Sequence, residues 1–181
     1  IANYREKNIL KTYLINDNFE KIKGTLRIRL LDFQGKICWE EDRKVLLGAD
    51  TSTVITEKTI TSLLKNYNPQ KVVLQTQLFS EEKMLDNDLY FFTEPKNLEI
   101  KQPKIKHTLK NQDKRKLILL STSSLAKNVY LSSTSDGHFS NNYFDMLPGK
   151  EYQVYFYSEH DNPGKITVKS LYEVLNNKFD R

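Results

Sequence analysis

Along much of the chain, apolar and polar side chains alternate with a period of two, which is typical of β-strands with one buried face. The alternation is clearest over residues 25–33, where three apolar residues fall on one face and two arginines on the other. Gln34-Gly35 then predicts a tight turn, since glycine supplies the positive φ that hairpin turns need. The next strand is predicted over residues 36–45, paired antiparallel with the first.

Shorter runs of the same kind predict the remaining elements. Ile60, Leu63 and Leu64 predict a short helical turn that ends at Asn66, of the kind that crosses between the sheets of a sandwich. Residues 88–93 include four consecutive apolar side chains, which predicts a strand buried on both faces. The other predicted strands cover residues 9–15, 71–79, 105–109, 117–122, 128–132, 139–144, 152–157 and 165–170. Neither helical heptads nor βαβ alternation occurs.

Two prolines, Pro95 and Pro103, frame a polar and charged segment that predicts a linker, with a domain boundary near Ile100. The chain has 181 residues, so this boundary gives one domain over residues 1–100 and a second over residues 101–181. Short strands separated by turn residues are typical of β-sandwiches. We therefore predict an all-β protein of two tandem immunoglobulin-like antiparallel β-sandwich domains.

Residues 137–152 predict the corner of the second sandwich. Five apolar side chains fall within nine residues, Pro148-Gly149 turns the chain, and Tyr152 opens an alternating strand. The segment is similar to a tyrosine corner, in which the hydroxyl of such a tyrosine bonds to backbone nearby. The residues that form this structural motif are Phe139, Ser140, Asn142, Tyr143, Phe144, Asp145, Leu147, Pro148, Gly149 and Tyr152.

The run also resembles a signature of β-mannosidases, which belong to family 2 of the glycoside hydrolases. That signature reads Phe-Ser-Asp-Asn-Tyr-Phe-Asp-Leu-Leu-Pro-Gly-Glu, and this chain departs from it at Asn141, Met146 and Lys150. A looser resemblance covers residues 87–96 (Asn-Asp-Leu-Tyr-Phe-Phe-Thr-Glu-Pro-Lys) and residues 23–26 (Lys-Gly-Thr-Leu). It implies a mannosidase Ig/CBM-like domain over residues 1–100 and a C-terminal, fibronectin III-like immunoglobulin domain over residues 101–181.

The function implied by the resemblance is that of a non-catalytic C-terminal portion of an exo-β-mannosidase. Such enzymes hydrolyse terminal non-reducing β-D-mannose residues from oligosaccharides with two glutamates on a (β/α)8 barrel, and neither glutamate can be carried over to this chain. The implied partners are that catalytic barrel, within the same polypeptide, and a β-mannoside oligosaccharide. No cofactor is implied. The alternative is a free-standing carbohydrate-binding or fibronectin III-like adhesion module.

The carboxylates of the second domain do not predict a catalytic pair. A retaining glycosidase needs two carboxyl groups about 5 Å apart, one of them held protonated by its surroundings. Asp136 fits a turn and Asp145 fits a backbone-bonding role at the corner. Glu151 and Glu159 bracket a predicted strand and are expected to face water. No residue of this chain is therefore assigned as catalytic.

Trp39 is the candidate for sugar stacking, because aromatic rings stack on the apolar faces of sugars, and core packing is the competing interpretation. Its neighbour Cys38 is expected to be a small buried thiol rather than a nucleophile, because no histidine lies nearby in the sequence. The three histidines, His107, His138 and His160, lack the spacing of metal ligands, so no metal site is predicted.

Charge and composition exclude two other classes of function. The formal net charge is +5, with 16 basic and 15 acidic residues up to Gln102 and 12 and 8 after it. The nearest approach to a basic run, Lys114-Arg115-Lys116, fits a solvated turn, so nucleic-acid binding is not predicted. No stretch of eighteen apolar residues occurs, so a membrane span is not predicted either.

Processing signals give two expectations about the source of the chain. The sequence contains no Asn-x-Ser/Thr acceptor site, which favours a periplasmic or secreted bacterial protein over a glycosylated lysosomal one. It begins with Ile1 rather than Met, which suggests a piece excised from something longer. Its single cysteine excludes an intrachain disulfide.

Overall fold

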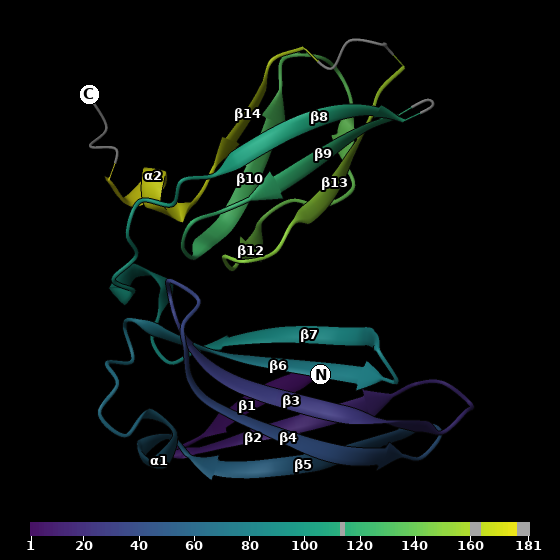
Figure 1. The fold of residues 1–181 in the computed structure, drawn as a ribbon, viewed down its shortest axis with the longest axis vertical. Coiled ribbons are helices and arrows are strands. Elements are labelled where there is room, and N and C mark those ends of the chain that lie inside the picture. Colours follow the sequence, from purple (N-terminus) through teal and green to yellow (C-terminus); the bar gives the residue numbers. More distant parts are fainter. Residues whose placement is uncertain (113–114, 160–163, 177–181) are drawn as a thin grey trace. The chain divides into compact units, whose positions relative to one another are not determined.

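A computed structural model describes residues 1–112, 115–159 and 164–176, which Figure 1 shows as a ribbon. The chain divides into a first unit, Ile1–Asp32 with Lys36–Leu98, and a second unit, Phe33–Gly35 with Glu99–Arg181. Nearly every described element is a strand in an antiparallel sheet, which confirms the predicted all-β sandwich fold. Lys114 and His160 lie outside the described residues. Separate folding of residues 1–100 and 101–181 stays a prediction.

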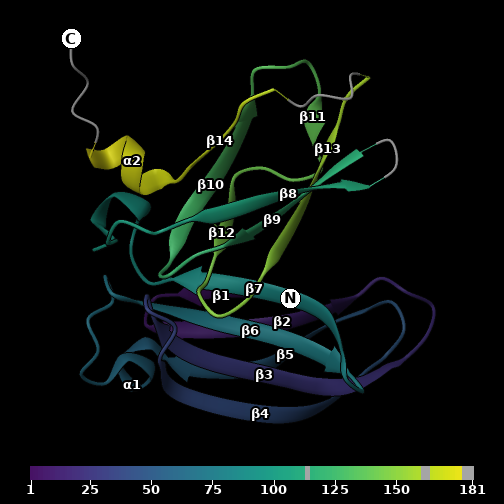
Figure 2. The ribbon, with the colours of Figure 1, turned by 45° about the horizontal axis from the view of Figure 1, so that its top comes forward.

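Two antiparallel sheets form the first unit. One has the strand order β1-β2-β5, from β1 (Ala2–Glu6), β2 (Ile9–Asn16) and β5 (Thr51–Thr59). The other has the order β4-β3-β6-β7, from β4 (Ile37–Leu47), β3 (Ile22–Asp32), β6 (Val72–Ser80) and β7 (Lys83–Phe91). Figure 2 shows β6 lying between β3 and β7. Two short elements complete the unit: α1 (Ile60–Leu64) and the 3₁₀ helix η1 (Pro95–Asn97).

The β3–β4 hairpin follows directly from the alternating sequence. Leu26, Ile28 and Leu30 point into the core of the first unit, each with no more than 1% of its surface exposed. The two arginines between them lie on the opposite face and pair across to acidic residues of β4. Gly35, in the turn, has φ of 86°, a conformation that favours glycine. The predicted antiparallel pairing of these two strands is confirmed.

Two expectations for the first unit are wrong or incomplete. The strand predicted over residues 88–93 begins earlier, at Lys83, and its residues 89–91 are only half-buried rather than buried on both faces. β7 lies at the edge of its sheet, which leaves its side chains partly open to solvent. Strands β1 and β5 were not predicted, because their residues show no regular alternation of apolar and polar positions.

The second unit also consists of two antiparallel sheets. One has the order β11-β13-β9-β8, from β11 (His138–Phe139), β13 (Tyr152–Tyr157), β9 (Arg115–Ser121) and β8 (Lys106–Gln112). The other has the order β12-β10-β14, from β12 (Phe144–Met146), β10 (Ala126–Ser133) and β14 (Ile166–Lys169). A short helix, α2 (Leu171–Asn176), follows β14. The buried core of this unit contains Ile118, Leu120, Ala126, Val129, Leu131, Met146, Val154, Phe156 and Ile166.

The single strand predicted over residues 139–144 is wrong. β11 ends at Phe139 and β12 begins at Phe144, and the two belong to different sheets. Between them, the Asn142 side chain accepts from Leu131 N at 2.7 Å and donates to Leu131 O at 2.9 Å, bonds that a neighbouring strand would otherwise make. Tyr143 has φ of 60°, which interrupts extended backbone. The apolar side chains of this segment therefore belong to two sheets rather than to one strand.

Candidate functional site

Tyr152 holds the corner of the second unit. Its hydroxyl accepts a hydrogen bond from Leu147 N at 2.7 Å, the backbone contact that characterises a tyrosine corner. Burial raises the pKa of Tyr152 to about 12, so the hydroxyl stays neutral at ordinary pH. Lys150 Nζ lies 4.7 Å from the centre of the Tyr152 ring, and burial lowers the pKa of this lysine. The arrangement stabilises the turn at this corner.

Asp145 is already occupied by partners within the same unit. Its carboxylate accepts from Lys127 Nζ at 2.8 and 3.0 Å and from Asn128 N at 2.8 Å. The side chains of the ion pair are only 13% and 17% exposed. Asn128 has φ of 50°, a conformation that asparagine tolerates better than most residues. Asp145 therefore holds the left-handed backbone at Asn128, in line with the backbone-bonding role expected for it.

Other residues of the corner motif also bind within the fold. Ser140 Oγ accepts from Tyr155 N at 2.9 Å. The rings of Phe139 and Phe156 lie 4.9 Å apart, centre to centre. Tyr143 is the exception, because 68% of its surface is exposed. Its ring stacks on that of Tyr130 in β10, a partner that sequence reasoning missed because nothing local connects the two residues.

The remaining candidate carboxylates do not resemble a glycosidase pair. Asp136, Glu151 and Glu159 are all exposed to solvent, whereas the acid of a glycosidase is kept protonated by a shielded environment. Glu151 and Glu159 flank β13, whose six residues span roughly 20 Å, several times the separation that a retaining pair needs. The geometry thus offers no support for a catalytic role of these carboxylates.

Trp39, the sugar-stacking candidate, lies on β4 and packs against the core of the first unit. Lys58 Nζ lies 5.0 Å from the centre of a Trp39 ring, so a cation already occupies part of the aromatic surface. Cys38, beside it, is partly buried, and this burial raises the pKa of its thiol. A raised thiol pKa disfavours the reactive thiolate. Sugar stacking by Trp39 stays a prediction.

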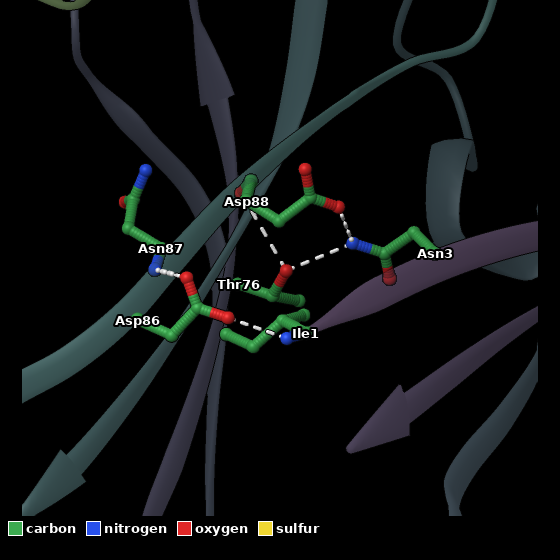
Figure 3. Close-up of polar contacts among 6 residues, drawn as sticks. All are labelled: Ile1, Asn3, Thr76, Asp86, Asn87 and Asp88. Carbon is green, nitrogen blue, oxygen red and sulfur yellow. Dashed lines mark hydrogen bonds and ion pairs between the residues drawn. The ribbon is translucent and has the colours of Figure 1, made fainter. Parts of the chain in front are cut away.

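A polar cluster ties the two sheets of the first unit together at one edge (Figure 3). Asn3 on β1 donates through Nδ2 to Thr76 Oγ1 on β6 and to Asp88 Oδ2 on β7, both at 2.8 Å. Its Oδ1 accepts from Thr12 Oγ1 on β2 at 2.7 Å. Both polar atoms of the Asn3 side chain are therefore used in closing the sandwich.

An open cleft of about 750 Å³ lies beside the ends of β3, β4 and β6 in the first unit. Three exposed lysines contribute to it, together with Glu81 on the turn between β6 and β7. One of them, Lys44, donates from Nζ to Thr25 Oγ1 at 3.0 Å. A single carboxylate among solvated lysines matches neither a glycosidase pair nor a metal site.

The two described histidines, His107 and His138, do not form a metal-binding cluster either. His138 stacks on Tyr157 with ring centres 5.0 Å apart, and His107 is exposed on β8. Within residues 1–112, 115–159 and 164–176, no three or more His, Cys, Asp or Glu side chains are placed to hold a metal ion. In the same part of the chain, no helix has the length and apolar character needed to cross a membrane.

Two protein families match the chain, one over each unit. Residues 8–97 match the Mannosidase Ig/CBM-like domain, and residues 100–174 match the Ig-fold domain of the Ig_mannosidase family. Comparison with curated proteins gave no match.

Solved structures show a similar fold. The β-D-mannosidase of Dictyoglomus thermophilum matches with a TM-score of 0.77 at 20% identity, covering 93% of this chain and 21% of that protein. The exo-chitosanase CsxA of Amycolatopsis orientalis, in a complex with PNP-β-D-glucosamine, matches with a TM-score of 0.55 at 12% identity, covering 88% and 25%. Another structure, of the exo-β-D-glucosaminidase CsxA, gives a TM-score of 0.54 at 13% identity, covering 90% and 24%. The chain thus spans a quarter or less of the length of these proteins.

Proposed function

The chain belongs to the Mannosidase Ig/CBM-like and mannosidase Ig-fold domain families, and from this membership we propose that it is the non-catalytic C-terminal portion of an exo-β-mannosidase of glycoside hydrolase family 2. The parent enzyme hydrolyses terminal non-reducing β-D-mannose residues of oligosaccharides. The observation that carries the proposal is the tandem match, in which both families occur in order over residues 8–97 and 100–174.

The structural comparison supports the same assignment. A β-D-mannosidase matches 93% of this chain with only 21% of its own length, which leaves room for a catalytic domain elsewhere in the parent. In this proposal, catalysis belongs to two glutamates of a barrel outside the chain. The two units pack on that barrel and steady the rim of its pocket.

Sequencing the gene on the 5′ side of the codon for Ile1 tests the assignment. We expect an open frame of several hundred codons with a (β/α)8 barrel pattern and a glutamate at the end of each of two strands. A start codon or a secretion signal immediately upstream would contradict the proposal and favour a free-standing module. The purified chain should not hydrolyse p-nitrophenyl β-D-mannoside. Turnover abolished by changing one of its carboxylates would also refute the assignment.

Deleting residues 1–181 from the parent enzyme tests the supporting role. The two glutamates remain in the shortened enzyme, so a lower melting temperature and a lower kcat/KM would come from loss of packing against the barrel. Asp42→Ala in the intact parent is the matched control, because it changes an exposed carboxylate of the first unit. If the shortened enzyme kept the kcat/KM and melting temperature of the intact one, the support role would be wrong.

A further inference from the structure

Tyr130 and Tyr143 of the second unit form a stacked pair, which we call the tyrosine pair. Tyr130 lies on β10 and Tyr143 lies in the loop between β11 and β12, with ring centres 5.1 Å apart and an interplanar angle of 28°. Tyr143 is 68% exposed and Tyr130 is 37% exposed. Because one face of the Tyr143 ring rests on Tyr130, its opposite face is the one presented to solvent.

The loop holds Tyr143 in a conformation that bulky residues avoid. Its φ of 60° lies in the left-handed region, where an aromatic side chain is a genuine outlier. The preceding residue, Asn142, is fixed to β10 through both of its hydrogen bonds to Leu131. Asp145, two residues later, is fixed by Lys127 and a backbone amide. Strain that is held in place by such contacts is found preferentially at sites of recognition.

We propose that the exposed face of Tyr143, supported by Tyr130, binds the apolar face of one pyranose ring of a neutral oligosaccharide. The C–H groups on one side of a pyranose ring form a flat apolar surface that complements an aromatic face. Asn141, two residues before Tyr143, is exposed, and Lys169 is exposed opposite Tyr130 on β14. Their side chains supply polar groups for the sugar hydroxyls at the edge of the tyrosine pair.

The size of the tyrosine pair favours a sugar ring over a protein surface. One aromatic side chain buries about 150–250 Å². A stable protein interface needs about 800 Å² from each partner. The exposed part of the pair therefore suits a single ring of a small ligand. Tyr143 also differs from Trp39, whose ring already contacts Lys58 and the core of the first unit.

Nuclear magnetic resonance of the isotope-labelled 181-residue chain, titrated with β-1,4-linked mannohexaose, tests this inference. We expect saturable shifts in the Tyr143 ring and in residues 140–144, together with saturation transfer from the tyrosine pair to the sugar. Tyr143→Gly removes the ring while keeping a residue that adopts φ of 60° without strain. It should weaken binding at least about tenfold, because a stacked aromatic anchor carries much of such an affinity.

Tyr4→Ala is the matched control. Tyr4 lies on β1 of the first unit and is 59% exposed, so its removal takes away a comparable surface ring and should leave binding unchanged. Unchanged amide resonances around Phe156 show that the core of the second unit is intact in each variant.

Three results would overturn the inference. The first is that the unmodified chain shows no saturable shifts at Tyr143, and the second is that Tyr143→Gly binds the sugar equally well. The third is that the remainder of the parent enzyme buries Tyr143 and that Tyr143 there does not respond to the sugar. The choice of a sugar as the ligand rests on the proposed function, but the sugar site and the proposed function can each be refuted without the other. Sugar binding at Tyr143 in a chain without an upstream barrel would refute the proposed function and retain the site.

Discussion

Polar side chains are used differently in the two units. On β3 and β4 of the first unit, two arginines pair across strands with Asp42 and Glu40, and these four side chains are 25–41% exposed. In the second unit, the side chains of Lys127 and Asp145 are only 13% and 17% exposed, and Asp145 also binds the Asn128 amide. Exposed pairs contribute about 0–1 kcal/mol. Breaking a shielded pair costs more, because the remaining charge is poorly solvated.

The difference follows from the lengths of the strands. β3 and β4 have eleven residues each and are held by their own backbone ladder. β11 and β12 have two and three residues, so side chains make up for missing backbone pairing. Asn142 and Tyr152 do this by bonding directly to main-chain atoms. Asn142 and Tyr152 both lie in the run of residues that carries the family resemblance.

Phe156→Ala tests whether the two units can be compared as separate bodies, and it has the largest expected effect. Phe156 is 1% exposed in the core of the second unit, so the substitution should lower the free energy of unfolding of that unit by about 3–5 kcal/mol. Trp39 is the sole tryptophan and lies in the first unit, so its fluorescence reports that unit. Circular dichroism reports both units.

If residues 1–100 and 101–181 fold separately, Phe156→Ala shifts the transition seen by circular dichroism and leaves that of Trp39 fluorescence in place. Leu46→Ala, at an exposed position of β4, is the control and should move neither transition by more than about 0.5 kcal/mol. An equal shift of both transitions in Phe156→Ala would mean that the chain unfolds as one body.

Asp145→Ala and Asp42→Ala compare the two kinds of ion pair directly. Loss of Asp145 removes the acceptor for Lys127 and for the Asn128 amide, which should cost about 2–3 kcal/mol. Loss of Asp42 removes an exposed partner of Arg27 and should cost less than about 1 kcal/mol. This cost should be smaller still at high salt, because salt screens exposed charges. Urea unfolding of both variants measures the difference. Equal losses would remove the distinction between the two units.

Local signals account for what the sequence could predict. The alternation of β3, the glycine turn and Tyr152 at the start of β13 each depend on neighbouring residues. The break after Phe139 depends on the hydrogen bond between Asn142 and Leu131, which are eleven positions apart, and no local pattern predicts such a contact. The tyrosine pair was missed for the same reason. The family could be recognised from the corner residues, whereas the activity proposed for the parent enzyme involves no residue of this chain.

Tyr152→Phe separates the corner hydrogen bond from simple ring burial. Removing the hydroxyl leaves the Leu147 amide without this acceptor and should cost about 1 kcal/mol at pH 8. The pKa of Tyr152, raised to about 12 by burial, also predicts a pH dependence. Well below pH 10, tyrosine is neutral in the folded and unfolded states alike, and its stabilising contribution is fully present.

As pH rises from 10 to 12, the unfolded state ionises first, so this contribution of Tyr152 to stability is lost. Because the ring is only partly buried, the loss should be at most about 2 kcal/mol. Tyr152→Phe lacks this loss, while nearby groups such as Lys150 titrate in both proteins. Urea unfolding between pH 8 and 12 gives the difference. An identical alkaline decline in both proteins would show that Tyr152 is not the group responsible.

Tyr143→Gly has the smallest expected effect on stability among these substitutions. Relief of the left-handed backbone gains about 1–2 kcal/mol. Loss of stacking on Tyr130 and the greater freedom of glycine in the unfolded chain cost a similar amount, so the melting temperature should hardly change. Tyr143→Ala keeps the strain and loses the ring, so it should be about 1 kcal/mol less stable than Tyr143→Gly. If Tyr143→Gly were strongly destabilised, Tyr143 would belong with Asp145 and Tyr152 as a structural residue. A stable Tyr143→Gly would instead mean that the second unit carries an exposed ring on a strained backbone, which its fold does not require.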